Sequence, residues 1–88
     1  MKIEQKLEVA CRRIGAFWDK GKEGRYIIWK GDKFAELFVH PVRGGGYEFD
    51  LFTPTGLYSS DDWREIHQQI IACFRAYPAL MPNRRIIL

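Results

Sequence analysis

The sequence has little cysteine and no long hydrophobic run, and each of these shortages excludes a class of protein. Only two of its 88 residues are cysteine, too few for the disulfide framework of a small secreted domain. No apolar stretch approaches the roughly 20 residues that a membrane-spanning helix needs. The first residues are rich in lysine, glutamate and glutamine, where a signal peptide has an apolar core. We therefore expect a cytoplasmic protein that makes no contact with a membrane.

The composition is that of a folded chain. Hydrophobic residues make up 47% and aromatic residues 15% of the sequence, which excludes intrinsic disorder. The length indicates one domain over residues 1–88, with residues 78–88 as a C-terminal tail. A domain of this size buries only about 60–65% of its unfolded surface, and a homodimer would add buried area.

The net charge of +3 is spread unevenly along the chain. Residues 1–43 carry ten Lys/Arg against six Asp/Glu, residues 44–74 carry one against five, and residues 75–88 carry three arginines and no acid. A nucleic-acid-binding domain concentrates its positive charge on one face. The sequence permits such segregation but does not require it.

Two amphipathic helices are predicted, one near each end of the chain. The first covers residues 2–18, and the second covers residues 60–77, begins at a capping serine (Ser59 or Ser60) and ends at Pro78. Apolar residues recur at helical spacing in both: Ile3, Leu7, Cys11, Ile14 and Trp18 in the first, and Trp63, Ile66, Ile70, Cys73, Phe74 and Tyr77 in the second. The two cysteines are therefore expected to be reduced core thiols, although a bridge between neighbouring helices stays open.

A β-hairpin is predicted between the helices, because Gly31-Asp32 separates two β-rich runs, residues 25–30 and 33–40. Pairing Lys30 with Lys33 sorts the side chains onto two faces, since successive residues alternate. The inner face would hold Tyr26, Ile28, Ala35, Leu37 and Val39. The outer face would hold Arg25, Ile27, Trp29, Phe34, Glu36, Phe38 and His40.

A third strand is predicted at residues 47–52, with Tyr47, Phe49 and Leu51 facing inward and Glu48, Asp50 and Phe52 facing outward. The predicted fold is α+β: a two-layer α-β-β-β-α arrangement with a three-stranded antiparallel sheet packed against the helices. The aliphatic end of the tail would add a short C-terminal strand or pack under the sheet.

No catalytic or metal-binding motif is present. His40 and His67 lack an HExxH context, and His67 is expected to be a solvated helix residue. The triple glycine at 44–46 precedes a strand rather than a helix, so it is not a phosphate-binding loop. Asp61 and Asp62 fit the negative charge favoured in the first turn of a helix. We expect no enzyme, no metal and no cofactor.

The outer sheet face is the candidate functional surface, because a contiguous apolar patch usually marks an interface. Its candidate partner-binding residues are Arg25, Ile27, Trp29, Phe34, Phe38 and His40. The expected occupant is a second copy in a homodimer or another protein, unless a helix or the tail covers this face within the monomer.

A second hypothesis for the outer face is single-stranded nucleic-acid binding. Trp29, Phe34 and Phe38 could stack on bases while Arg25, Lys30 and Lys33 hold phosphates. Three acids on the same face, Glu36, Glu48 and Asp50, count against this hypothesis because they repel phosphate.

Overall fold

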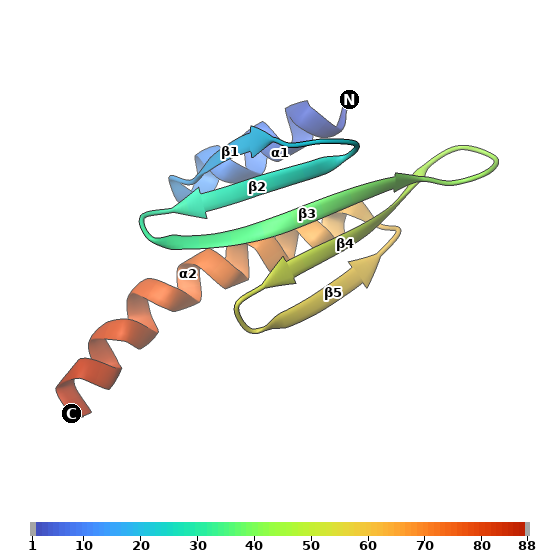
Figure 1. The fold of residues 1–88 in the computed structure, drawn as a ribbon. Helices are drawn as coiled ribbons and strands as arrows, with labels where there is room; N and C mark the ends of the chain where they lie inside the picture. The colour runs from blue at the N-terminus through green and yellow to red at the C-terminus, as the bar shows by residue number, and fades with distance from the viewer. Residues whose placement is uncertain (1, 88) are drawn as a thin grey trace.

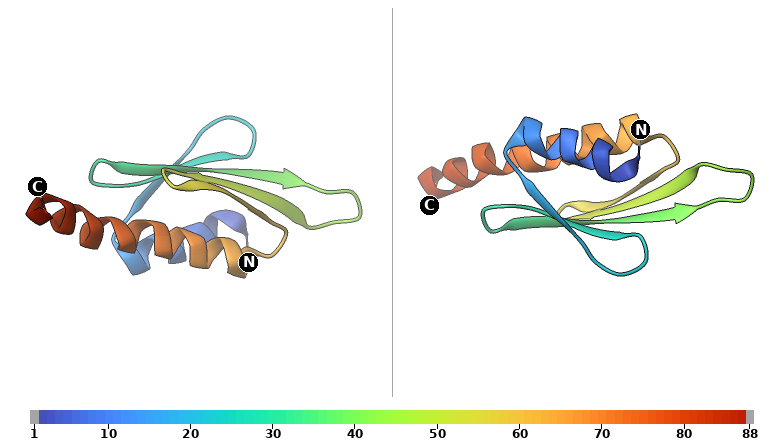
Figure 2. Two further views of the ribbon diagram at one scale, coloured as in Figure 1. Left: turned by 90° about the horizontal axis from the view of Figure 1, so that it is seen from below. Right: turned by 90° about the horizontal axis from the view of Figure 1, so that it is seen from above.

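The fold is a five-stranded antiparallel sheet with both helices on one of its faces (Figures 1 and 2). The computed structural model describes the backbone of residues 2–87 and the side chains of residues 2–75. Helix α1 (Ile3–Ile14) opens the chain and α2 (Trp63–Ile87) closes it. Between them the strands lie in chain order: β1 (Phe17–Lys20), β2 (Arg25–Lys30), β3 (Lys33–Pro41), β4 (Tyr47–Thr53) and β5 (Gly56–Ser60). The α+β class is confirmed, but the sheet has five strands rather than the predicted three.

The predicted register of the central hairpin is confirmed. Lys30 pairs with Lys33, Trp29 with Phe34, and the ladder continues to Arg25 opposite Phe38. All five predicted inner-face residues of this hairpin are buried, as are Phe49 and Leu51 of β4. Tyr47 is the exception: it was predicted to face the core, but it pairs with Pro41 at the far end of the ladder and is 44% exposed.

The first helix is shorter than predicted. It ends at Ile14 because Gly15 adopts a left-handed conformation (φ 69°), and its N–H donates to the Arg12 carbonyl. Phe17–Lys20 then forms β1 at the sheet edge, although the first two of these residues were predicted to belong to the helix. The spacing of four residues between Ile14 and Trp18 fits a helix, but Trp18 reaches the core from the inner side of a strand.

Two glutamates hold α1 against the inner side of β1 and β2. The Trp18 indole N–H donates to Glu8 at 2.7 Å, and the Tyr26 hydroxyl donates to Glu4 at 3.0 Å. Burial and the hydrogen bond to Glu4 raise the pKa of Tyr26 to about 12. These contacts fix α1 on the inner face and leave the opposite side of the strands clear of it.

The second helix starts later and runs further than predicted. The segment before it forms β5, which pairs with β4 after the turn at Thr53–Gly56. The backbone of α2 is helical through Pro78 and on to Ile87, although proline removes a backbone hydrogen bond and disfavours a helix interior. The predicted C-terminal strand is therefore absent from the backbone of residues 79–87. The alternative prediction, that the tail packs under the sheet, concerns side chains outside the described ones.

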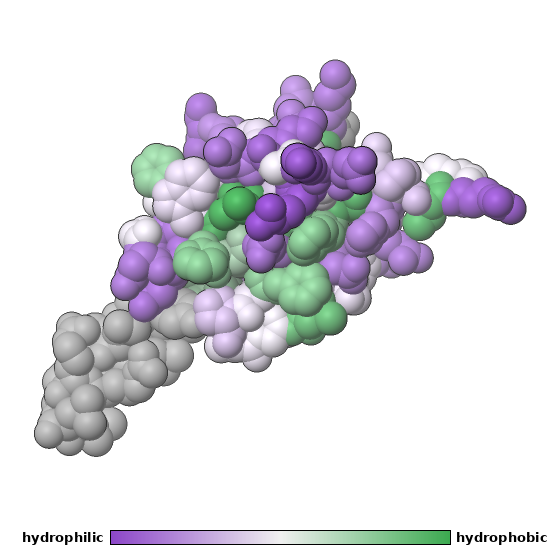
Figure 3. All heavy atoms as spheres, in the orientation of Figure 1, coloured by the Kyte–Doolittle hydropathy of each residue, from purple (hydrophilic) through white to green (hydrophobic). Residues whose placement is uncertain are grey.

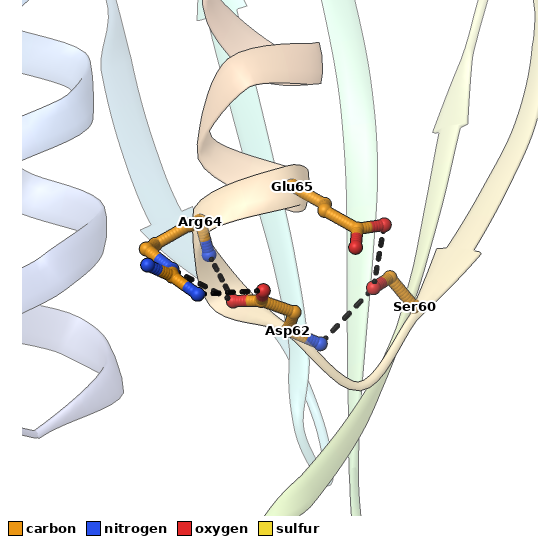
Figure 4. Close-up of polar contacts among 4 residues, drawn as sticks. All are labelled: Ser60, Asp62, Arg64 and Glu65. Carbon is orange, nitrogen blue, oxygen red and sulfur yellow. Dashed lines mark hydrogen bonds and ion pairs between the residues drawn. The ribbon is translucent and has the colours of Figure 1, made fainter.

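Asp62, rather than Ser59 or Ser60, caps α2 (Figure 4). Its carboxylate accepts the backbone N–H of Arg64 at 2.9 Å, while its own N–H donates to the Ser60 hydroxyl at 3.0 Å. Ser60 in turn donates to Glu65 at 3.1 Å. Hydrogen bonds from the Arg64 backbone and side chain lower the pKa of Asp62. Ser60 therefore does not cap the helix itself but holds the capping residue Asp62 in place.

We expect Asp62→Ala to lower the melting temperature by a few degrees, since a lost N-cap leaves helix N–H groups unpaired. Asp61→Ala is the matched control because it removes the same charge one residue before the cap. Thermal unfolding followed by circular dichroism compares the two. Equal melting temperatures for both variants would show that the Asp62 cap does not stabilise α2.

The two cysteines are free. Cys11 is fully buried in the core, as predicted, and burial raises the pKa of its thiol to about 12. Cys73 is half-buried and packs against the core.

His67 is half-buried rather than solvated as predicted, and its ring meets that of Trp63 edge to face. Its Nε2 is buried and makes no hydrogen bond with any described residue. Burial, together with the Arg13 charge, lowers the pKa of the imidazole.

Candidate protein-binding face

The outer face of the sheet is covered by neither helix (Figure 2). Figure 3 looks onto this face and shows hydrophobic side chains with hydrophilic ones around and between them. The pairing of all five strands defines its membership. The outer face consists of the following residues: Phe17, Asp19, Arg25, Ile27, Trp29, Phe34, Glu36, Phe38, His40, Glu48, Asp50, Phe52, Leu57 and Ser59.

Four large apolar side chains of the outer face are strongly exposed. Phe17 is 61%, Phe34 62%, Phe52 45% and Leu57 55% exposed. They are unlike scattered surface apolar residues, because each lies next to another apolar side chain of the same face. Phe17 and Leu57 were not predicted here, since both belong to strands that the sequence analysis missed.

Strand pairing arranges these side chains into an aromatic row and a second apolar group. The aromatic row is Phe17, Trp29 and Phe34, which are direct neighbours across β1, β2 and β3. The rings of Phe17 and Trp29 stack with centroids 5.9 Å apart. In the second group, Phe38 and Phe52 meet edge to face at 5.5 Å. Mutual packing of this kind holds the rings in place before any partner arrives.

The predicted residues Ile27, Trp29, Phe34 and Phe38 all lie on this face, and so do Arg25 and His40. The last two already have partners there. The Arg25 guanidinium contacts Glu36 at 2.6 Å, and His40 Nε2 lies 3.0 Å from an Asp50 carboxylate oxygen. Arg25 and His40 are therefore tied to acids of the same face rather than directed only at a ligand.

The outer face is acidic although the whole chain is basic. It carries Asp19, Glu36, Glu48 and Asp50 against Arg25, a net charge of −3 with His40 neutral, whereas the chain has +3. A hydrogen bond from Ser59 and the contact with His40 lower the pKa of Asp50, so its charge persists into mild acid. Asp19 and Glu48 form no ion pair within residues 2–75.

The lysines predicted to hold phosphates do not share a face with the aromatic row. Lys30 and Lys33 pair with each other one step beyond Trp29 and Phe34, so their side chains alternate to the inner side. Although Lys30 and Lys33 are adjacent in sequence to Trp29 and Phe34, the alternation along a strand directs them away from the aromatic row. Arg25 is left as the only arginine or lysine on the outer face.

Other kinds of site have little support among the described residues. No group of three His, Cys, Asp or Glu side chains there could hold a metal ion. An open groove beside the start of α1 is lined in part by Glu4, Tyr26 and Tyr47, but Glu4 and Tyr26 are already hydrogen-bonded to each other. None of the helices within the described residues is long and apolar enough to cross a membrane.

Comparisons with known proteins add no functional information. No protein-family model matches the sequence, and neither the curated proteins nor the solved structures gave a match.

Proposed function

We propose that this protein is a small, non-enzymatic binding module whose outer sheet face docks a protein chain. The observation that carries the proposal is the exposure of Phe17, Phe34, Phe52 and Leu57 on a face that neither helix covers. Aromatic side chains surrounded by charged ones are typical of protein interfaces. Leaving this much apolar surface in water is costly unless a partner covers it.

The charge of the outer face favours one kind of occupant. A net charge of −3 repels phosphate, which argues against the single-stranded nucleic-acid hypothesis. It also opposes the pairing of this face with the same face of a second copy, because two acidic surfaces would meet. The partner that fits is an apolar protein segment carrying lysine or arginine.

Three aromatic residues of the outer face are the proposed anchors: Trp29 and Phe34 beside the β2–β3 turn, and Phe38 further along β3. Aromatic residues of this type dominate binding energy in protein interfaces, and truncating one costs on the order of 2–4 kcal/mol of binding. The Arg25–Glu36 pair lies between them and is half-exposed. It would set the orientation of the partner more than the affinity.

Affinity capture with the full-length protein tests the proposal. Phe34→Ser should weaken partner retention at least tenfold relative to the wild type, because it removes an exposed anchor without opening the core. The bound fraction is measured by titrating immobilised protein against cell extract and identifying retained proteins by mass spectrometry.

Val9→Ser is the matched control, because Val9 is 46% exposed on α1, on the other side of the molecule. It should leave retention unchanged. If Phe34→Ser and Val9→Ser retain the same proteins to the same extent, the outer face is not the binding surface.

A further inference from the structure

We infer that the outer face is occupied by the C-terminal segment, residues 75–88, of a second copy of this chain. The inference rests on the proposed function, because it names the partner of the same face. The two copies would exchange these segments, and each copy would use its outer face and its segment once. Such reciprocal exchange closes into a two-fold symmetric dimer rather than an open chain.

The first support is complementary chemistry. The segment contains Arg75, Arg84 and Arg85 and no acidic residue, a charge of +3, against −3 on the outer face. Its sequence ends in three aliphatic residues, 86–88, directly after two of the arginines. An aliphatic stretch beside arginines matches aromatic rings beside carboxylates, in both apolar and electrostatic terms.

The C-terminal segment and the aromatic row also lie at the same end of the molecule. The backbone of α2 continues past the sheet at the end where the β2–β3 hairpin lies, as all three ribbon views show (Figures 1 and 2). That is also the end that carries the aromatic row, because Trp29 and Phe34 flank the hairpin turn. The segment and its proposed docking surface therefore project at the same end of the molecule.

The same placement favours docking of the segment onto the outer face of a second copy rather than onto the outer face of its own chain. Helix α2 lies on the inner side of the sheet and spans about 37 Å for its 25 residues at ~1.5 Å per residue. To reach its own outer face, the segment would have to leave the helix and fold back around the sheet. A neighbouring copy can present its outer face directly to the projecting helix.

Sedimentation velocity of the full-length protein over a concentration series tests the inference. The wild type should form a dimer of twice the 10.4 kDa chain mass. Arg84→Glu combined with Arg85→Glu should raise the dimer dissociation constant at least tenfold, because like charges then meet. Adding Asp19→Lys should recover a large part of the loss, since Asp19 lies beside the aromatic row and has no ion pair within residues 2–75.

The control replaces two exposed cations elsewhere, Lys22→Glu with Arg43→Glu, which changes the net charge equally and should leave the dimer intact. A wild type that stays monomeric at every concentration overturns this inference but leaves capture of another protein by the outer face standing. A dimer that survives Arg84→Glu/Arg85→Glu but is lost in Phe34→Ser also overturns it, with the proposed function intact. A dimer insensitive to both sets of changes contradicts the inference and shows that self-association does not use the outer face.

Discussion

Leu37→Ala is expected to lose about 2–5 kcal/mol of unfolding free energy, whereas Phe34→Ala loses less than about 1 kcal/mol. Both residues belong to β3, three positions apart, so they face opposite sides of the sheet. Leu37 is 0% exposed and packs in the core, so its truncation leaves a cavity under the helices. Phe34 is 62% exposed, so its truncation leaves no cavity in the core. A loss of the first size is a large part of the roughly 5–10 kcal/mol that stabilises a small domain.

Urea unfolding at low protein concentration measures this difference, because dilution removes any contribution from association. The change in midpoint at constant slope gives the free energy. Comparable losses for Leu37→Ala and Phe34→Ala would mean that the outer face is buried in the monomer, and the proposed docking surface would be ruled out.

Gly24→Ala is expected to cost about 2–4 kcal/mol, more than an ordinary glycine substitution. Gly24 has a φ of 76°, and a Cβ there would lie 2.5 Å from the Val39 carbonyl oxygen. The contact is with backbone that cannot move freely, because the Val39 N–H donates to the Gly24 carbonyl at 2.8 Å. The substitution therefore combines a left-handed conformation with a collision at the start of β2.

Gly31→Ala provides the comparison, since Gly31 also has a positive φ (62°) but nothing lies within 4 Å of the added carbon. Only the conformational penalty of about 1–2 kcal/mol remains there. The same unfolding experiment applies to both variants. Equal destabilisation would show that the close approach of Gly24 to β3 does not constrain the fold.

The central hairpin could be predicted from the sequence because two independent signals agree. A glycine-led two-residue turn fixes which residues pair, and the apolar positions of both runs then fall on one face. A register shifted by one residue would put Leu37 on the opposite face from Tyr26 and Ile28, whereas all three are buried together. The same logic extends to β4, where Phe49 and Leu51 are buried as predicted.

The two edge strands could not be predicted in the same way. β1 has four residues and β5 has five, too few for alternation to be distinguished from helical spacing. Trp18 continues the apolar stripe of α1, and the serines of β5 resemble helix caps. These two segments become strands only because they pair with β2 and β4, and such pairing depends on the tertiary structure.

The candidate site was predictable to the same extent as the strands that carry it. Ile27, Trp29, Phe34 and Phe38 followed from the hairpin register, while Phe17 and Leu57 depended on the edge strands. Three of its four acids, Glu36, Glu48 and Asp50, followed from the same alternation, whereas Asp19 joins the face only through β1.

Radical footprinting of the full-length protein at low and high concentration shows whether association covers the outer face. Oxidation of Phe17 and Phe34 should fall on association, while oxidation of Val9 on α1 should stay constant. Association that leaves Phe17 and Phe34 fully reactive, or that protects Val9 instead, would contradict the assignment of the outer face as the binding surface.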